Sequence, residues 1–252
     1  LVNRIKPSPN SNSAMKALLK AMVAERPTPR LGIEGYSAVG GLYDVVLQAT
    51  GLHEEGQDGY VFQEPSPEND SCNLTPLWQA TDAFFDANDD RSVNLTELYD
   101  MWRKPPFGIK DGLLPFFAVA YLMTRRNSYA VYLERVYRPS IDDLFIDYLV
   151  KVPSDIAFRK MEFSATGEKI LAGVAHVINR IEPDQPALDE TSAPLEIARR
   201  LVALVINLPP WVLRSRQLSQ NTIQLRELVK NANDPNKVLF DDLPYIFPEH
   251  QE

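Results

Sequence analysis

Hydrophobic residues recur every three or four positions along most of the chain, which is the spacing that places them on one face of an α-helix. This pattern predicts helices over residues 11–27, 39–50, 75–87, 95–104, 112–126, 141–152, 165–181, 195–208 and 221–232. Alternating or β-branched runs predict short strands over residues 60–63, 92–94, 129–134, 136–138 and 157–164. The predicted fold class is therefore mainly α with minor β.

The same periodicity assigns roles to individual side chains. In the helix over residues 39–50, the side chains expected to face the core are Leu42, Val45, Val46 and Leu47. Asp111 precedes the helix over residues 112–126 and is expected to cap it. His176 lies among apolar residues of its helix and is expected to be a hydrogen-bonded packing residue.

Residues 75–138 place the predicted elements in the order helix, short strand, helix, turn, helix and hairpin. This is the order of a winged helix-turn-helix, so we predict a winged helix-turn-helix-like module embedded in a helical domain. Its third helix contains the run from Leu113 to Met123, in which Tyr121 is the only polar side chain. Because a recognition helix needs polar groups that face base edges, this third helix is expected to turn inward.

The proline- and acid-rich stretch EPDQPALDETSAP, residues 182–194, is the best boundary in the chain. We predict an N-terminal helical segment over residues 1–74, and a C-terminal helical segment over residues 183–252. Between them, residues 75–182 hold the winged-helix-like module with a following helix, strand and helix. The aromatic-rich stretch 234–247 is expected to pack onto the last helices.

Composition limits the partners and the cellular compartment that are expected for the protein. The chain has 252 residues and is 44% hydrophobic, which suffices for a sizeable core, and its net charge of −8 argues against coating nucleic acid throughout. Cys72 is the only cysteine, so no intrachain disulfide forms and a cytoplasmic setting is expected. No apolar run reaches the roughly 18 residues of a membrane span, so no membrane partner is expected. The chain opens on Leu1 without a signal-peptide pattern, and we expect a segment of a longer protein.

Basic residues gather on the turn and hairpin of the winged-helix stretch. Between Asp100 and Ser140, seven basic residues stand against three acidic ones, a local charge of +4 in an acidic chain. Lysine and arginine contact phosphates without reading sequence. The candidate contacts to the DNA backbone or to a partner protein are Arg103, Lys104, Lys110, Arg125, Arg126, Arg135 and Arg138.

Residues 84–97, FFDANDDRSVNLTE, have the spacing of an EF-hand calcium loop. Such a loop places oxygen ligands at positions 1, 3, 5, 7 and 9, glycine at 6 and a bidentate glutamate at 12. The matching residues are Asp86, Asn88, Asp90, Ser92, Asn94 and Glu97. Arg91 stands at the glycine position, and no second EF-hand is present in the sequence. A solvated acidic connection between two helices is the favoured interpretation, and Ca²⁺ is the alternative cofactor.

The sequence contains no motif for catalysis or nucleotide binding. Gly35 and Gly40 have the glycine spacing of a phosphate-binding loop, but Gly41 and Leu42 occupy the lysine and serine/threonine positions. The three histidines are far apart, and neither G-x-S-x-G nor H-E-x-x-H occurs. We therefore expect no enzymatic activity and no cofactor other than the calcium alternative.

Several segments together resemble a known group of proteins. They are RLGIEGYSAVGGLYDVVLQATGLH, PPFGIKDGLLPFFAVAYL, AVYLERVYRPSI and LPPWVLRSRQLSQNTIQLRELVKNANDPNKVLFDDLPYIF. They are similar to the region beyond the nucleotide site in very large bacterial P-loop ATPases of anti-phage defence islands, of the BREX ATPase kind. The resemblance runs from Arg30 to Phe247 and includes no catalytic residue.

The resemblance implies a mostly helical accessory region through which a defence ATPase engages DNA or a partner subunit. Its expected partners are the parent ATPase core, other subunits of the defence complex and the DNA backbone. Two other interpretations stay open: a calcium-responsive interaction module around residues 86–97, and a purely structural scaffold that joins subunits. A response to calcium favours the first of these, and a response to neither calcium nor DNA favours the second.

Overall fold

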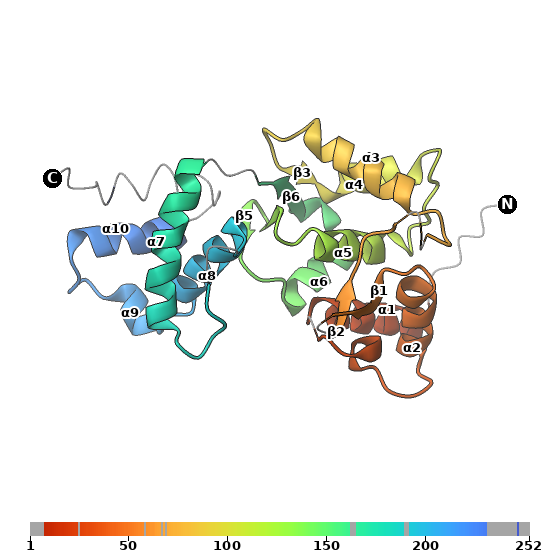
Figure 1. Cartoon of the computed structure of the whole chain (residues 1–252), viewed down its shortest axis with the longest axis horizontal. Coiled ribbons are helices and arrows are strands. Elements are labelled where there is room, and N and C mark those ends of the chain that lie inside the picture. Colours follow the sequence, from red (N-terminus) through yellow and green to blue (C-terminus); the bar gives the residue numbers. More distant parts are fainter. Residues whose placement is uncertain are drawn as a thin grey trace. The chain divides into compact units, whose positions relative to one another are not determined.

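The computed structural model describes residues 8–24, 26–57, 59–66, 68, 70–161, 165–188, 192–230 and 246. At residues 165–171 and 230 it describes the backbone alone. The described chain is mainly helical with short strands, which confirms the predicted fold class at this level (Figure 1). Within the described residues, no helix has the length and the apolar character of a membrane span. The chain divides into two compact units: unit 1 holds residues 1–126 and 141–154, and unit 2 holds residues 127–140 and 155–252.

Unit 1 is built mostly from helices. They are α1 (Pro9–Val23), α2 (Ala38–Tyr43), α3 (Thr75–Asp86), α4 (Leu95–Arg103), α5 (Leu114–Thr124) and α6 (Asp143–Lys151). A 3₁₀ turn covers Pro29–Gly32, and a π-helical turn, Asp44–Gln48, extends α2. The strands β1 (His53–Gly56) and β2 (Gly59–Phe62) form an antiparallel hairpin, and the short strand β3 (Val93–Asn94) precedes α4.

Helix α5 forms the centre of unit 1. Residues 114–122 are all buried, and the helix packs against α1, whose Leu18 and Leu19 are fully buried. Helix α6 packs on α1 as well. In α4, the indole nitrogen of the fully buried Trp102 donates a hydrogen bond to the Thr81 hydroxyl of α3, at 2.9 Å. The predicted inward orientation of the apolar helix is therefore confirmed.

Unit 2 combines an antiparallel sheet with helices. Strand β4 (Tyr129–Leu133) lies between β5 (Val136–Arg138) and β6 (Ile156–Lys160), so that Leu133 pairs with Val136 on one side and with Ile156 on the other. The helices that follow are α7 (Ala165–Ile181), α8 (Pro194–Ile206), α9 (Pro210–Arg214) and α10 (Gln220–Lys230).

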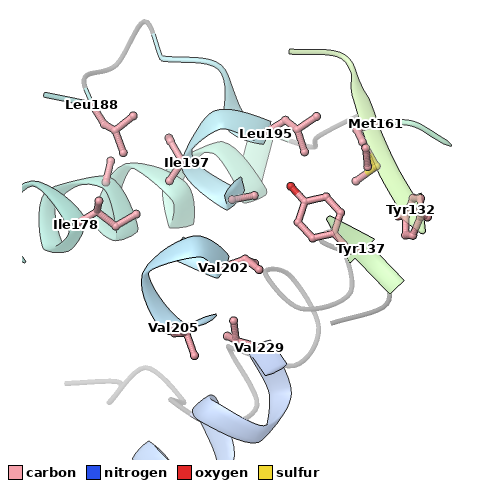
Figure 2. Close-up of a cluster of buried hydrophobic side chains, with 13 residues drawn as sticks. Tyr132, Tyr137, Met161, Ile178, Leu188, Leu195, Ile197, Val202, Val205 and Val229 are labelled. Atoms are coloured by element: carbon pink, nitrogen blue, oxygen red, sulfur yellow. The ribbon is translucent and has the colours of Figure 1, made fainter. Parts of the chain in front are cut away.

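A hydrophobic cluster joins the sheet of unit 2 to its helices. Figure 2 shows side chains from the sheet, α7, α8 and α10 meeting in this cluster. The labelled members are Tyr132, Tyr137, Met161, Ile178, Leu188, Leu195, Ile197, Val202, Val205 and Val229. Arg199 of α8 is buried beside it, and its Nη2 donates to the carbonyl oxygen of Tyr129 at 3.1 Å.

The helices and the hairpin of the predicted winged helix belong to different units. Helices α3, α4 and α5 are part of unit 1, whereas β4 and β5 are part of unit 2. The winged arrangement therefore stays a prediction. Both predicted domain boundaries, 74/75 and 182/183, lie inside a unit, since α1 packs on α5 across the first and α7 packs on α8 across the second.

Two predicted core positions are wrong. Val45 is 69% exposed, because the turn after α2 is π-helical and its i→i+5 bonds rotate the buried face away from a 3.6-residue period. Tyr43 occupies a buried position instead. His176 is exposed on α7, so it is not a packing residue.

The predicted cap of the apolar helix is also wrong. Leu113 is the N-cap of α5, and the carboxylate of Asp111 accepts a hydrogen bond from Arg103 at 2.8 Å. The predicted strand over residues 60–63 is confirmed in substance as β2, and β1 is its partner in a hairpin that the sequence pattern did not indicate. The predicted packing of residues 234–247 lies outside the described residues, apart from Ile246.

Candidate functional site

The seven basic candidate residues do not form one surface within a single unit. Arg103, Lys104, Lys110, Arg125 and Arg126 belong to unit 1, and Arg135 and Arg138 belong to unit 2. Lys104, Lys110 and Arg135 are exposed, whereas Arg126 and Arg138 are half-buried. Lys104 and Lys110 lie on the turn that connects α4 to α5.

Arg125 is held by carboxylates of its own unit. Its Nη2 lies 2.7 Å from Oδ2 of Asp82 in α3, and its Nη1 pairs with Glu64 of the segment after β2. The hydroxyl of Tyr121 donates to the other oxygen of Asp82, at 2.6 Å. The side chain of Arg125 is only 21% exposed. Its charge is therefore used within unit 1.

Arg103 is paired in a similar way at the end of α4. Its Nη1 lies 2.9 Å from Oδ1 of Asp100, and its Nε lies 2.8 Å from Oδ1 of Asp111. These two carboxylates raise the pKa of the guanidinium further above its ordinary value. Arg103 and Arg125 were predicted to contact phosphate, but their guanidinium groups are already paired with carboxylates of the protein.

The acidic loop between α3 and α4 contains the predicted calcium ligands, and the side chain of Arg91 lies among them. Its guanidinium donates twice to Oδ1 of Asn88, at 2.7 and 3.0 Å, and to both carboxylate oxygens of Glu97, at 2.9 and 2.8 Å. Nη1 also donates to the carbonyl oxygen of Ser92, at 3.3 Å.

Glu97 has a second task at the start of α4. Its Oε1 accepts a hydrogen bond from the backbone N–H of Asn94, and the side chain of Asn94 accepts one from the N–H of Thr96, which completes a capping box. The hydrogen bonds from Arg91 hold the pKa of the Glu97 carboxyl below its ordinary value. Within the described residues, no three acidic, histidine or cysteine side chains gather closely enough to hold a metal ion. Calcium binding stays a prediction.

A buried histidine lies in unit 1 where the sequence pattern gave no signal. His53 is 2% exposed, and its Nδ1 lies 2.8 Å from the hydroxyl of Tyr43. The rings of Tyr60 and Phe62 pack beside the imidazole, with centroids at 5.6 and 4.9 Å. Burial lowers the pKa of His53 to about 4 and raises the pKa of Tyr43 to about 12. Both side chains are therefore neutral at neutral pH.

Residues 206–218 of unit 2, here named the Trp211 segment, expose large apolar side chains in short succession. Trp211 is 74% exposed, and Ile206 and Leu218 are exposed as well. Arg214 and Arg216 are also exposed, and the segment contains no acidic residue. The helical periodicity of apolar residues does not indicate this surface. A signal is nevertheless present in the sequence, because residues 209–215, PPWVLRS, place Trp211 and Arg214 close together after two prolines.

A buried arginine fixes the conformation of the Trp211 segment. Arg226 of α10 is 8% exposed, and its Nη1 donates to the carbonyl oxygens of Val212 and Ser215, at 3.1 and 2.7 Å. A buried guanidinium can donate several hydrogen bonds in a fixed geometry, so these bonds tie α10 to the backbone of α9 and to the residue that caps its end. Trp211 and Arg214 therefore project from a supported backbone.

No protein-family model, no curated protein and no solved structure matches the chain. The described residues offer three features of functional interest: the basic turn with Lys104 and Lys110, the loop closed by Arg91, and the Trp211 segment.

Proposed function

We propose that the chain is a non-catalytic interaction region of a larger bacterial ATPase of the phage-defence kind, and that it binds a protein subunit. The parent ATPase follows from the resemblance of residues 30–247. The choice of a protein partner follows from one observation, the exposed and supported Trp211 segment.

The chemistry of the Trp211 segment is that of a protein-binding surface. Tryptophan and arginine are enriched at protein interfaces and supply most residues whose truncation weakens binding strongly. The bonds from Arg226 reduce the conformational freedom that binding would otherwise remove. Because Arg214 and Arg216 both follow Trp211 closely without a nearby carboxylate in the sequence, the matching partner surface has an apolar pocket with acidic side chains at its edge.

The basic residues of unit 1 give weaker support to a DNA partner. Arg103 and Arg125 are paired with carboxylates, and α5 is buried on all sides, so it presents no face to a groove. A contact with the DNA backbone would depend on Lys104 and Lys110. The net charge of −8 opposes it further at long range.

The protein partner is tested by capture and then by affinity. The full chain serves as bait in a lysate of a bacterium that carries the parent ATPase, and the captured protein is identified, purified and titrated by calorimetry. Trp211→Ala should weaken its affinity by about 30-fold, the loss expected for a central tryptophan. Val177→Ala, at an exposed valine of α7, is the control and should leave the affinity unchanged. An unaltered affinity of Trp211→Ala would exclude the Trp211 segment as the contact.

The DNA partner is tested separately by fluorescence anisotropy with duplex DNA at low and physiological salt. The proposal expects no affinity that depends on the basic turn, so the double variant Lys104→Glu, Lys110→Glu should behave as the wild type does. If the wild type binds DNA with an affinity that falls as salt rises, and the double variant loses this binding, the DNA backbone is the partner and the proposal of a protein partner is wrong. Substitutions of Arg125 do not serve here, because they remove the partner of Asp82 and Glu64.

A further inference from the structure

The oxygen atoms around Arg91 occupy the ligand positions of a calcium loop. In an EF-hand, position 3 contributes a side-chain oxygen, position 7 its backbone carbonyl, and position 12 both carboxylate oxygens. In residues 86–97 these positions are Asn88, Ser92 and Glu97. The guanidinium of Arg91 contacts the same atoms at each of them: Oδ1 of Asn88, the carbonyl oxygen of Ser92, and Oε1 and Oε2 of Glu97.

We propose that Arg91 is a built-in cation that takes the place of calcium in an EF-hand-like loop, so that this loop joins α3 to α4 without a metal. The guanidinium suits this role because it carries a permanent positive charge and five N–H donors in one plane. It presents donors to oxygen atoms that would otherwise face a metal ion.

Arg91 fixes the orientation of Glu97 more than it adds to the stability of the fold. Its side chain is 43% exposed and that of Glu97 is 40% exposed, so solvent screens the attraction between them. The bidentate contact nevertheless fixes the orientation of Glu97, whose Oε1 also caps the first turn of α4. The end of α3 and the start of α4 are thereby linked through a single side chain.

The backbone conformation at Arg91 also disfavours calcium binding. Position 6 of a calcium loop is glycine because the sharp turn there calls for a conformation that other residues adopt at a cost. Arg91 does not have a positive φ, unlike five other non-glycine residues of the described chain. The loop therefore follows a different path at this position, and a glycine would remove both obstacles: the guanidinium on Glu97 and the restriction of the backbone. Asp86, Asp90 and Asn94 would remain as further oxygen ligands.

The test is a gain of calcium binding in the full chain. Arg91→Gly, freed of metal by a chelator, is titrated with CaCl₂ by calorimetry, and its melting temperature is followed with and without Ca²⁺. We expect binding in the range of weak calcium loops, with a dissociation constant of about 0.1–1 mM, and a melting temperature that rises with calcium. The wild type should bind no calcium and show no shift at these concentrations.

Two further variants separate the causes. Arg91→Gly combined with Glu97→Gln should lose the calcium response, because a neutral amide replaces the bidentate carboxylate. Arg91→Ala frees Glu97 without the freedom of glycine, and should bind calcium more weakly than Arg91→Gly; it also serves if glycine destabilises the loop. Calcium binding by the wild type would overturn the proposal. So would the failure of both folded single variants at Arg91 to bind calcium.

Discussion

At the scale of single residues, His53 has its charge state set by its surroundings. The imidazole lies between aromatic rings, and within the described part of the chain its hydrogen-bond partner is the hydroxyl of Tyr43. No carboxylate is among the causes of its lowered pKa, which comes from burial alone. A proton on this ring would therefore bring an unpaired charge into the interior of unit 1, which costs free energy.

The free energy of unfolding should consequently fall as the pH decreases from about 6.5 to about 4. In the unfolded chain His53 has an ordinary pKa of about 6.5, whereas in the folded chain the pKa is about 4. Between these values the unfolded state binds a proton that the folded state does not, so protonation favours unfolding. The contribution is complete above pH 6.5, and the full shift corresponds to at most about 3 kcal/mol. Urea titrations at a series of pH values, followed by tryptophan fluorescence, measure it.

Two variants identify the group responsible. His53→Gln keeps a polar partner for Tyr43 but cannot titrate, and it should flatten the pH dependence between 6.5 and 4. His176→Gln makes the same change at an exposed histidine of α7 and should leave that dependence as in the wild type. A slope that survives in His53→Gln would assign the titration to another group.

At the scale of elements, the amphipathic helices were predictable because their apolar side chains lie on one face. Helix α5 was predictable for the opposite reason, since a run of this length that is apolar on all its faces, with Tyr121 as its one polar residue, is expected to be buried. The hairpin of β1 and β2 was not, because β1 reads HEEG and contains none of the β-branched or aromatic residues that a strand pattern would select. The misplaced Val45 has a local cause, a π-helical turn that no 3.6-residue period describes.

The candidate site was harder to predict than the helices. The set of basic contact residues stays a prediction, and the partner of Arg125 lies 43 residues away in α3. Periodicity within one element carries no information about such a pairing. The contact between Arg91 and Glu97 spans six residues, and sequence spacing identified its oxygen atoms but assigned no role to the arginine in the middle. The buried state of His53 depends on Tyr43 and on a hairpin that was itself missed.

Arg125 connects three parts of unit 1, and its removal should therefore lower stability. It joins α5 to Asp82 of α3 and to Glu64 after β2. Arg125→Ala leaves the half-buried Asp82 and the exposed Glu64 without this partner, and we expect a loss of about 1–3 kcal/mol in the free energy of unfolding. Urea unfolding of the full chain measures the difference.

Lys110→Ala is the matched control, because it removes a positive charge from an exposed position of the same unit and should change stability little. If Arg125→Ala were as stable as Lys110→Ala, the carboxylates would not need Arg125, and it would return to the set of candidate partner contacts.

At the scale of the whole molecule, the chain passes between its two units three times, near residues 126, 140 and 154. Neither unit is therefore a continuous stretch of sequence. The core of unit 2 draws Tyr132 and Tyr137 from one part of the chain, and Ile178, Val202 and Val229 from another (Figure 2). A division at 74/75 and 182/183 cuts through both cores.

A fragment of residues 75–182 should consequently not fold cooperatively by itself. It lacks α1, whose Leu18 and Leu19 pack in the core of unit 1, and it lacks α8, on which α7 packs in unit 2. Each large apolar side chain left in water forgoes roughly 1.5–3 kcal/mol, and several are exposed at once, which exceeds the margin of a typical domain. Urea unfolding of the fragment should show no sigmoidal transition, and its amide NMR signals should be poorly dispersed.

The full chain with a protease site inserted between α7 and α8 is the control for the cut at 182/183. After cleavage, α7 and α8 keep all their apolar partners, so the two pieces should stay associated during gel filtration and unfold together. A fragment 75–182 that unfolds in a cooperative transition would support the division predicted from the sequence. It would then be α1 and α8 that depend on the middle of the chain, and not the reverse.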